Sequence, residues 1–186
     1  MYLLPGIVGF GAFCLFDINK IRWRSRMLNF LFAIGCILLA TSTLLCMPSL
    51  SRESSTPHVR HLVGLAGLLL SAAGLIYVLF FALPFESTYT ESDALPLVSH
   101  GAYGLCRHPG FWLFALFYFF LWVTFTGHRL FIGFLLYSAC NYGYIYLQDR
   151  YIFPKYIFGY DDYKKNVPFL LPTRESIKWA FSAKGI

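Results

Sequence analysis

Five long apolar stretches, separated by short polar or charged segments, constrain this chain more than any other feature. They cover residues 2–16, 27–47, 62–85, 109–126 and 130–147. A helix needs about 20 apolar residues to cross a hydrocarbon core of about 30 Å, so each stretch predicts a membrane-spanning helix. We therefore expect an all-α fold, a polytopic membrane helical bundle with about five transmembrane helices.

The composition agrees with a membrane protein. Of the 186 residues, 58% are hydrophobic and 13% are charged, whereas about a quarter of the residues in a soluble domain are charged. Five spans use most of the chain, which excludes a large soluble catalytic domain. We expect a single integral membrane domain over 1–186, in which residues 148–186 form a cytoplasmic C-terminal cap. The five cysteines are an odd number and lie mostly in apolar stretches, which favours packing over a disulfide framework.

The distribution of basic residues predicts the orientation in the membrane. If all five stretches cross, the segments 17–26, 86–108 and 148–186 share one side. Twelve of the fifteen Lys and Arg residues lie in these segments, and the positive-inside rule assigns such segments to the cytoplasm. The N-terminus is then outside, while the identity of the membrane stays open. Because the basic residues flank spans, they predict contact with membrane lipids and no nucleic-acid partner.

Small residues predict how two of the helices pack. The third stretch contains Gly64, Gly67, Ser71 and Gly74, which allow a neighbouring helix to approach closely. Only residues 126–129 separate the fourth and fifth stretches, so these two stretches form a tight helical hairpin.

Polar residues gather at two predicted helix ends. The first group precedes the fourth stretch and ends in Arg107-His108-Pro109. Proline suits the first turn of a helix, so Arg107 and His108 lie beside free backbone N–H groups, where an anion can bind. Alternatively, Arg107 extends to lipid headgroups and His108 caps the helix.

The second group of polar residues begins with a polar face on the fifth stretch. This face consists of Tyr137, Asn141, Tyr144, Gln148 and Asp149 at helical spacing. A polar face in so small a bundle predicts a cavity. Beyond it, Tyr160 and Tyr163 belong to a segment rich in Lys and Tyr, which an amphipathic helix at the membrane surface explains equally well.

These residues resemble the integral membrane methyltransferases related to isoprenylcysteine carboxyl methyltransferase and phospholipid N-methyltransferase. The family's Gly-x-Tyr-x-x-x-Arg-His-Pro motif is present without a gap from Gly101 to Pro109. Its C-terminal signature is an acidic pair on the last span, then Tyr-x-x-Tyr and Val-Pro. The matching residues are Gln148, Asp149, Tyr160, Tyr163, Val167 and Pro168. The resemblance covers about the C-terminal half of the chain, and the first half matches only in hydropathy.

The resemblance implies an enzyme that uses S-adenosylmethionine at the cytoplasmic face and methylates a lipophilic acceptor from the bilayer. It implies a cofactor-binding set of Tyr103, Arg107, His108, Pro109, Gln148, Asp149, Tyr160 and Tyr163. Within this set it implies catalytic roles for Arg107 and Asp149. Methyl transfer is an in-line displacement that depends on positioning and desolvation, so it needs no covalent nucleophile. No metal is expected.

The sequence departs from the family's pattern at three positions. Phe111 replaces a tyrosine, Gln148 replaces the first acidic residue of the pair, and Ile157 replaces a glycine. Asp149 is thus the only carboxylate of the pair, which puts the usual cofactor affinity or substrate choice in question.

Three other interpretations stay open. Sterol-reductase-like membrane enzymes share the Arg-His-Pro and Tyr-x-x-Tyr pattern and use a nicotinamide cofactor. They look like larger proteins with additional spans, for which 186 residues leave no room. A non-catalytic membrane scaffold of the same fold is supported by the departures at Phe111 and Gln148. Zinc catalysis is disfavoured, because Cys106 and His108 have only His100 as a nearby third ligand.

Overall fold

The computed structural model describes residues 1–48, 58–82 and 97–181 of the chain. Within these ranges every secondary-structure element is a helix, as the sequence predicts. Residues 83–85 of the third apolar stretch, residues 86–96 of the predicted segment 86–108, and the basic residues Arg52 and Lys184 lie outside them.

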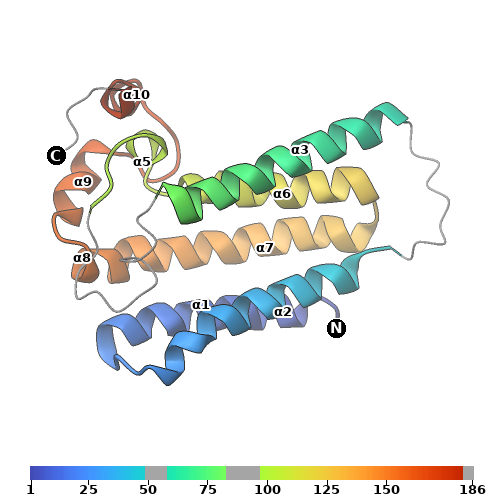
Figure 1. Cartoon of the computed structure of the whole chain (residues 1–186), viewed down its shortest axis with the longest axis horizontal. Helices are drawn as coiled ribbons and strands as arrows, with labels where there is room; N and C mark the ends of the chain where they lie inside the picture. Colours follow the sequence, from blue (N-terminus) through green and yellow to red (C-terminus); the bar gives the residue numbers. More distant parts are fainter. Residues whose placement is uncertain (49–57, 83–96, 182–186) are drawn as a thin grey trace.

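Five long helices form the body of the molecule (Figure 1). They are α1 (Leu4–Arg22), α2 (Phe30–Cys46), α3 (His58–Ile76), α6 (Pro109–Phe125) and α7 (His128–Leu147). Three short turns extend them: η1 (Met27–Asn29) before α2, and the π-helical turns η2 (Tyr77–Phe81) after α3 and η3 (Gln148–Ile152) after α7. Four shorter helices gather at one end of the bundle: α5 (Ala102–Leu105), α8 (Phe153–Tyr156), α9 (Tyr160–Asn166) and α10 (Arg174–Phe181).

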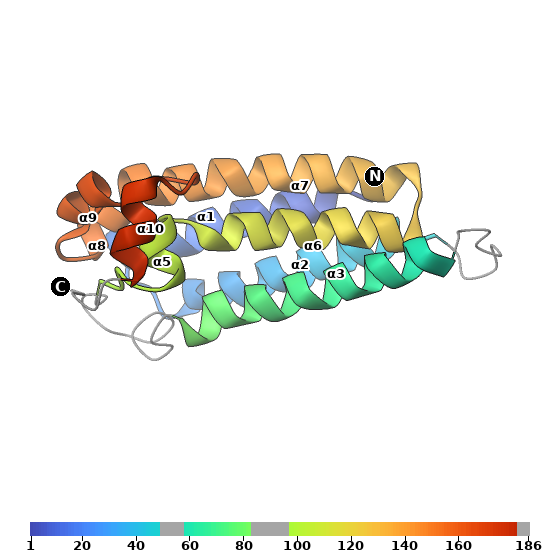
Figure 2. The ribbon, with the colours of Figure 1, turned by 90° about the horizontal axis from the view of Figure 1, so that it is seen from above.

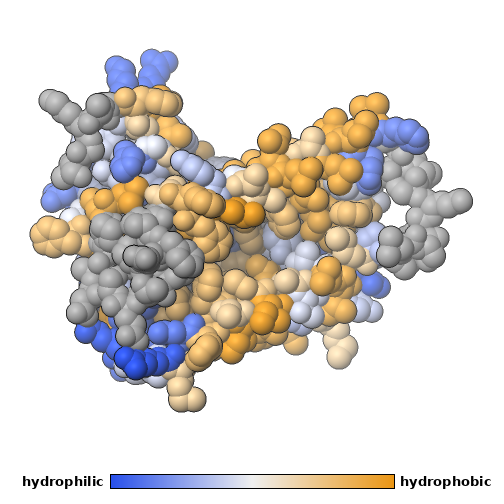
Figure 3. Space-filling view, viewed as in Figure 1, coloured by the Kyte–Doolittle hydropathy of each residue, from blue (hydrophilic) through white to orange (hydrophobic). Residues whose placement is uncertain are grey.

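Among the described residues, four helical segments are long and apolar enough to cross a membrane. They are Leu4–Arg22, Met27–Cys46, His58–Phe81 and His128–Tyr156, whereas the apolar helix α6 is shorter, with 17 residues. Large apolar side chains are exposed along these helices, among them Ile37, Leu44, Leu69 and Leu70. Figure 3 shows this apolar surface over the middle of the molecule. Such exposure is costly in water and favourable in lipid, which is consistent with a membrane protein.

Two helices are longer than the apolar stretches that predict them. The first continues beyond residue 16 to Arg22, and the helix that begins at His128 continues beyond residue 147 to Tyr156. Hydropathy misses these turns because they contain polar residues, yet Asp17 and Gln148 satisfy each other across the two helices. A helix can continue through buried polar residues when their side chains have hydrogen-bond partners.

The long helices pack as two antiparallel pairs, α1 with α2 and α3 with α6, which α7 joins (Figures 1 and 2). A Cβ atom on Gly9 of α1 would lie 2.9 Å from the carbonyl oxygen of Gly35 in α2. On α3, a Cβ on Gly64 would lie 2.6 Å from Oγ1 of Thr124, and one on Gly67 would overlap the ring of Phe120. The predicted close approach along the third stretch is confirmed.

The polar face of α7 is partly core rather than the lining of a cavity. Tyr137 is almost fully buried, and its ring packs against Phe10 and Tyr118. Its hydroxyl lies 2.6 Å from Oγ of Ser42. The expectation that the polar face lines a cavity is therefore wrong at Tyr137, because its ring fills the core and its hydroxyl has a partner on α2.

Candidate functional site

The two predicted polar groups meet at the end of the bundle where α8, α9 and α10 lie (Figure 1). His108 is the residue that precedes α6, and Pro109 is its first residue, as the sequence predicts. The backbone N–H of Arg107 donates a 2.9 Å hydrogen bond to the carbonyl of Pro168. The entry to α6 is thus fixed against the C-terminal segment that follows α9.

Asp149, in the π-helical turn η3, is the centre of the arrangement. Arg107 donates two parallel hydrogen bonds to it, from Nε to Oδ1 at 2.7 Å and from Nη2 to Oδ2 at 3.1 Å. The hydroxyl of Tyr160 donates to Oδ1 at 2.7 Å, and Nε2 of His108 lies 3.4 Å from the same oxygen. Nζ of Lys164 lies 3.7 Å from Oδ2. Both charged side chains of the central pair are about one-tenth exposed, at 10% for Arg107 and 11% for Asp149.

The third nitrogen of the Arg107 guanidinium binds the backbone of the C-terminal segment. Nη1 donates to the carbonyl of Val167 at 2.7 Å and to that of Lys164 at 3.3 Å. The guanidinium carbon lies 5.6 Å from the ring centroid of Phe169. Arg107 is therefore turned into the protein rather than toward lipid headgroups, and its planar fork suits the two carboxylate oxygens.

His108 is enclosed by aromatic rings. Phe153 stacks on it at a centroid distance of 5.8 Å, and Phe169 meets its edge at 5.1 Å. Burial lowers the pKa of His108, and Asp149 opposes this shift only in part. The imidazole is thus neutral at pH 7, where one ring nitrogen donates and the other accepts a hydrogen bond.

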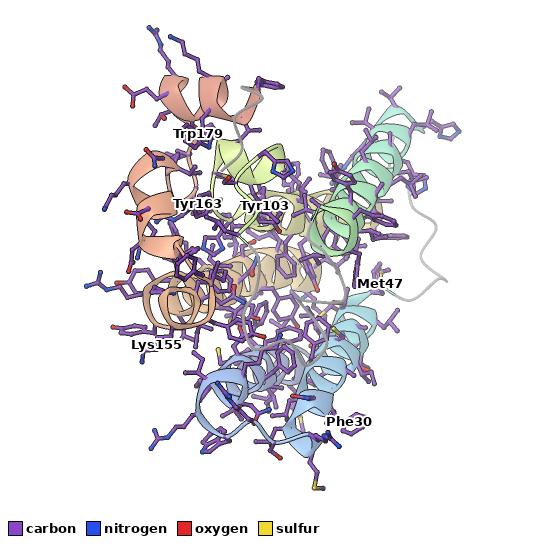
Figure 4. The ribbon with its side chains drawn as sticks, turned by 60° about the vertical axis from the view of Figure 1, so that its left-hand side comes forward. Phe30, Met47, Tyr103, Lys155, Tyr163 and Trp179 are labelled. Carbon is purple, nitrogen blue, oxygen red and sulfur yellow. The ribbon has the colours of Figure 1, made fainter. Side chains whose placement is uncertain are left out.

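The tyrosines of the predicted set connect separate elements. Figure 4 shows Tyr103 and Tyr163 near each other beside α5 and α9. The hydroxyl of Tyr163 donates to the backbone carbonyl of Tyr103, whose own hydroxyl donates to Val78 in η2 at 3.2 Å. Burial raises the pKa of Tyr163, and burial together with Asp149 raises that of Tyr160, so both hydroxyls stay protonated.

Gln148 does not join this cluster. Its side-chain amide donates a 2.8 Å hydrogen bond to Oδ2 of Asp17 on α1. Successive residues of a helix point in different directions, so Gln148 faces α1 while Asp149 faces Arg107 and Tyr160. The structure therefore separates two residues that the sequence groups together.

The sequence analysis does not assign several residues of this region to the site. Asp17 is buried beside Gln148, and Nζ of Lys20 lies 4.8 Å from the ring centroid of Phe16 and 5.5 Å from that of Tyr156. An Asp and a Lys three residues apart at the end of an apolar stretch are the signal that indicates a continued helix. Lys164 carries no such signal, because only the fold brings it to Asp149.

The residues around Asp149 form a cluster that contains both hydrogen-bond donors and acceptors. It combines a guanidinium, a carboxylate, a neutral imidazole and two neutral phenols at the end of an apolar bundle. These groups can bind carboxylate, ammonium and hydroxyl groups of a ligand. In the described ranges, no group of three or more His, Cys, Asp and Glu residues is placed to hold a metal ion. As arranged, the polar atoms satisfy one another and clamp α6, η3 and α9 together.

No family model, no curated protein and no solved structure matches this chain.

Proposed function

We propose that the protein is an integral membrane enzyme that transfers a methyl group from S-adenosylmethionine to a lipophilic acceptor. The observation that carries the proposal is the convergence of Arg107 and His108 with Asp149 and Tyr160. These residues come from distant parts of the sequence, yet they meet at one end of an apolar bundle. The uninterrupted motif from Gly101 to Pro109 supports the same assignment.

The proposal includes the arrangement in the membrane. All five long helices span, α6 included, with the N-terminus outside and the site on the cytoplasmic side. The charge distribution supports this arrangement. Eleven described Lys and Arg residues lie in the segments 20–26, 107 and 150–178, at the end of the bundle where the cluster lies. Helix α6 is short for a bilayer of about 30 Å, and local thinning accommodates such a mismatch at modest cost.

The residues of the cluster fit the polar groups of this cofactor. Arg107 would bind its carboxylate, Asp149 its amino or hydroxyl groups, and Tyr103 and Tyr163 would form walls of the binding site. When bound, the cofactor supplies a sulfonium methyl group, whose carbon–sulfur bond breaks as the bond to the acceptor forms. Since Arg107 and Asp149 satisfy each other, ligand binding must exchange part of this ion pair for contacts to the ligand. The chain's residues position the ligand and exclude water.

Calorimetry on detergent-purified protein tests the proposal directly. We expect micromolar binding of S-adenosylmethionine and S-adenosylhomocysteine, weakened at least tenfold by His108→Ala and by Asp149→Asn. The matched control is Asp162→Asn, because Asp162 is exposed and its carboxylate pairs with Lys165 in the same helix. A thermal unfolding curve for each variant separates lost binding from lost folding.

The same titration includes NADPH. Binding of NADPH alone contradicts methyl transfer and favours the reductase-like alternative.

A non-catalytic scaffold is the second candidate, and one observation favours it. Both carboxylate oxygens of Asp149 are already engaged by side chains of the protein itself. In that case wild-type protein binds neither cofactor, while Asp149→Asn still lowers the unfolding temperature. The calorimetric and thermal measurements together therefore distinguish the two functions.

A further inference from the structure

The connection between α1 and α2 holds the densest positive charge in the chain. Residues 20–26, which we name the basic turn, comprise the end of α1 and the start of this connection, and they include Lys20, Arg22, Arg24 and Arg26. No Asp or Glu occurs between residues 18 and 48. Figure 3 shows strongly hydrophilic atoms at this corner, at the lower left, directly beside apolar surface.

One buried side chain fixes the shape of the basic turn. Asn19 is 1% exposed. Its Nδ2 donates to the carbonyl of Ser25 at 2.9 Å, and its Oδ1 accepts from the N–H of Ser25 at 2.9 Å. Its backbone carbonyl accepts from the N–H of Arg24 at 2.7 Å, which holds Arg24 in a left-handed conformation with φ of 51°. Arg22, Arg24 and Arg26 are exposed on this preorganised backbone, which lowers the entropic cost of binding.

Exposed apolar side chains border the basic turn. Trp23 is 51% exposed, Met27 82% and Phe30 69%. Figure 4 shows Phe30 at the edge of the molecule beside this connection. Tryptophan is typical of the membrane–water interface, and the apolar residues that follow it begin a candidate span. Cationic and apolar groups thus adjoin at the start of a candidate span, as the phosphate and the acyl chains adjoin in a phospholipid.

We propose that the basic turn binds the headgroup of an anionic phospholipid, with Arg22, Arg24 and Arg26 around the phosphate and Met27 and Phe30 against an acyl chain. The guanidinium fork suits phosphate oxygens. A lipid uses both the cationic and the apolar part of the surface, whereas a free phosphate uses only the first. This site is independent of the proposed methyl transfer.

Thermal unfolding of the detergent-purified full chain tests the site, with dioleoylphosphatidylglycerol or dioleoylphosphatidylcholine added to the micelles. We expect phosphatidylglycerol to raise the unfolding temperature of the wild type more than phosphatidylcholine. Each basic residue near an anionic surface contributes about 1 kcal/mol, so replacing the three arginines by glutamine raises the phosphatidylglycerol needed for half-maximal protection on the order of a hundredfold. Added salt reduces the protection.

The control variant removes the same charge elsewhere. Lys155, Lys165 and Lys178 are exposed, and their replacement by glutamine should leave the phosphatidylglycerol effect unchanged. An equal loss in both triple variants would show that only net charge matters and would overturn the site. Equal protection by both lipids, or full protection by inorganic phosphate alone, would overturn it as well.

Discussion

At the scale of single residues, Asp149 has an unusual concentration of donors. The two hydrogen bonds from Arg107 and the one from Tyr160 satisfy a carboxylate that burial would otherwise penalise. Removal of one partner leaves buried polar atoms of the network with fewer hydrogen bonds. The stability of this end of the molecule and the candidate function therefore depend on the same few atoms.

Tyr160→Phe removes the hydroxyl that donates to Oδ1 of Asp149 and keeps the ring that packs against Phe153. We expect a loss of about 1–3 kcal/mol in unfolding free energy, because a buried acceptor loses a donor. Denaturant titration in detergent measures this loss. Tyr151→Phe is the control, since Tyr151 is exposed and should tolerate the change. Equal stability of Tyr160→Phe and the wild type would contradict the role of the hydroxyl.

At the scale of elements, close contact between helices depends on the absence of a side chain. In the α3–α6 pair, Gly67 leaves the space that the ring of Phe120 fills. In the α1–α2 pair, Gly9 and Gly35 bring two backbones together. In a bilayer such packing replaces the hydrophobic effect as the main attraction between helices.

Gly67→Ala should destabilise the protein by about 1–3 kcal/mol, because the new Cβ overlaps an aromatic ring that cannot shift without repacking. The matched control is Gly11→Ala in α1, where a Cβ meets no atom within 4 Å. There alanine is neutral or stabilises by up to about 1 kcal/mol through helix propensity. Thermal unfolding of both variants compares them, and an unchanged midpoint for Gly67→Ala would refute the packing argument.

At the scale of the whole molecule, the surface over the middle of the long helices is mostly apolar (Figure 3), and eleven described Lys and Arg residues lie at one end of the bundle. The candidate site and the basic turn both lie at this end (Figure 1). If the proposed five spans are correct, both face the cytoplasm, where anionic lipids lie and soluble cofactors are available.

Introduced cysteines test this arrangement in a background without the five native cysteines. We expect Arg26→Cys and Glu175→Cys to react with a membrane-impermeant maleimide only after cells are permeabilised, because both residues lie at the proposed cytoplasmic end. His128→Cys at the opposite end should be accessible to the reagent only from the other face of the membrane. Labelling of positions 26 and 175 from opposite faces would refute the five-span topology.

The sequence by itself determined the helical class, the apolar core of each long helix and the close packing along the third stretch. These features are local, because hydropathy, small residues and a proline at a helix start act within one or two turns. The positions of Arg107 and His108 at the start of a helix were predictable for the same reason, whereas Asp149 lies inside a helix that continues beyond the apolar stretch.

Only the tertiary structure decided which polar groups meet. Asp149 and Gln148 are adjacent in sequence, but one binds Arg107 and the other binds Asp17. Likewise, Tyr137 finds Ser42 instead of lining a cavity, and Asn19 fixes the basic turn through Ser25. A side chain's partner depends on the angle at which its helix faces distant neighbours. A sequence records the polar groups that need partners, and the packing of the helices selects those partners.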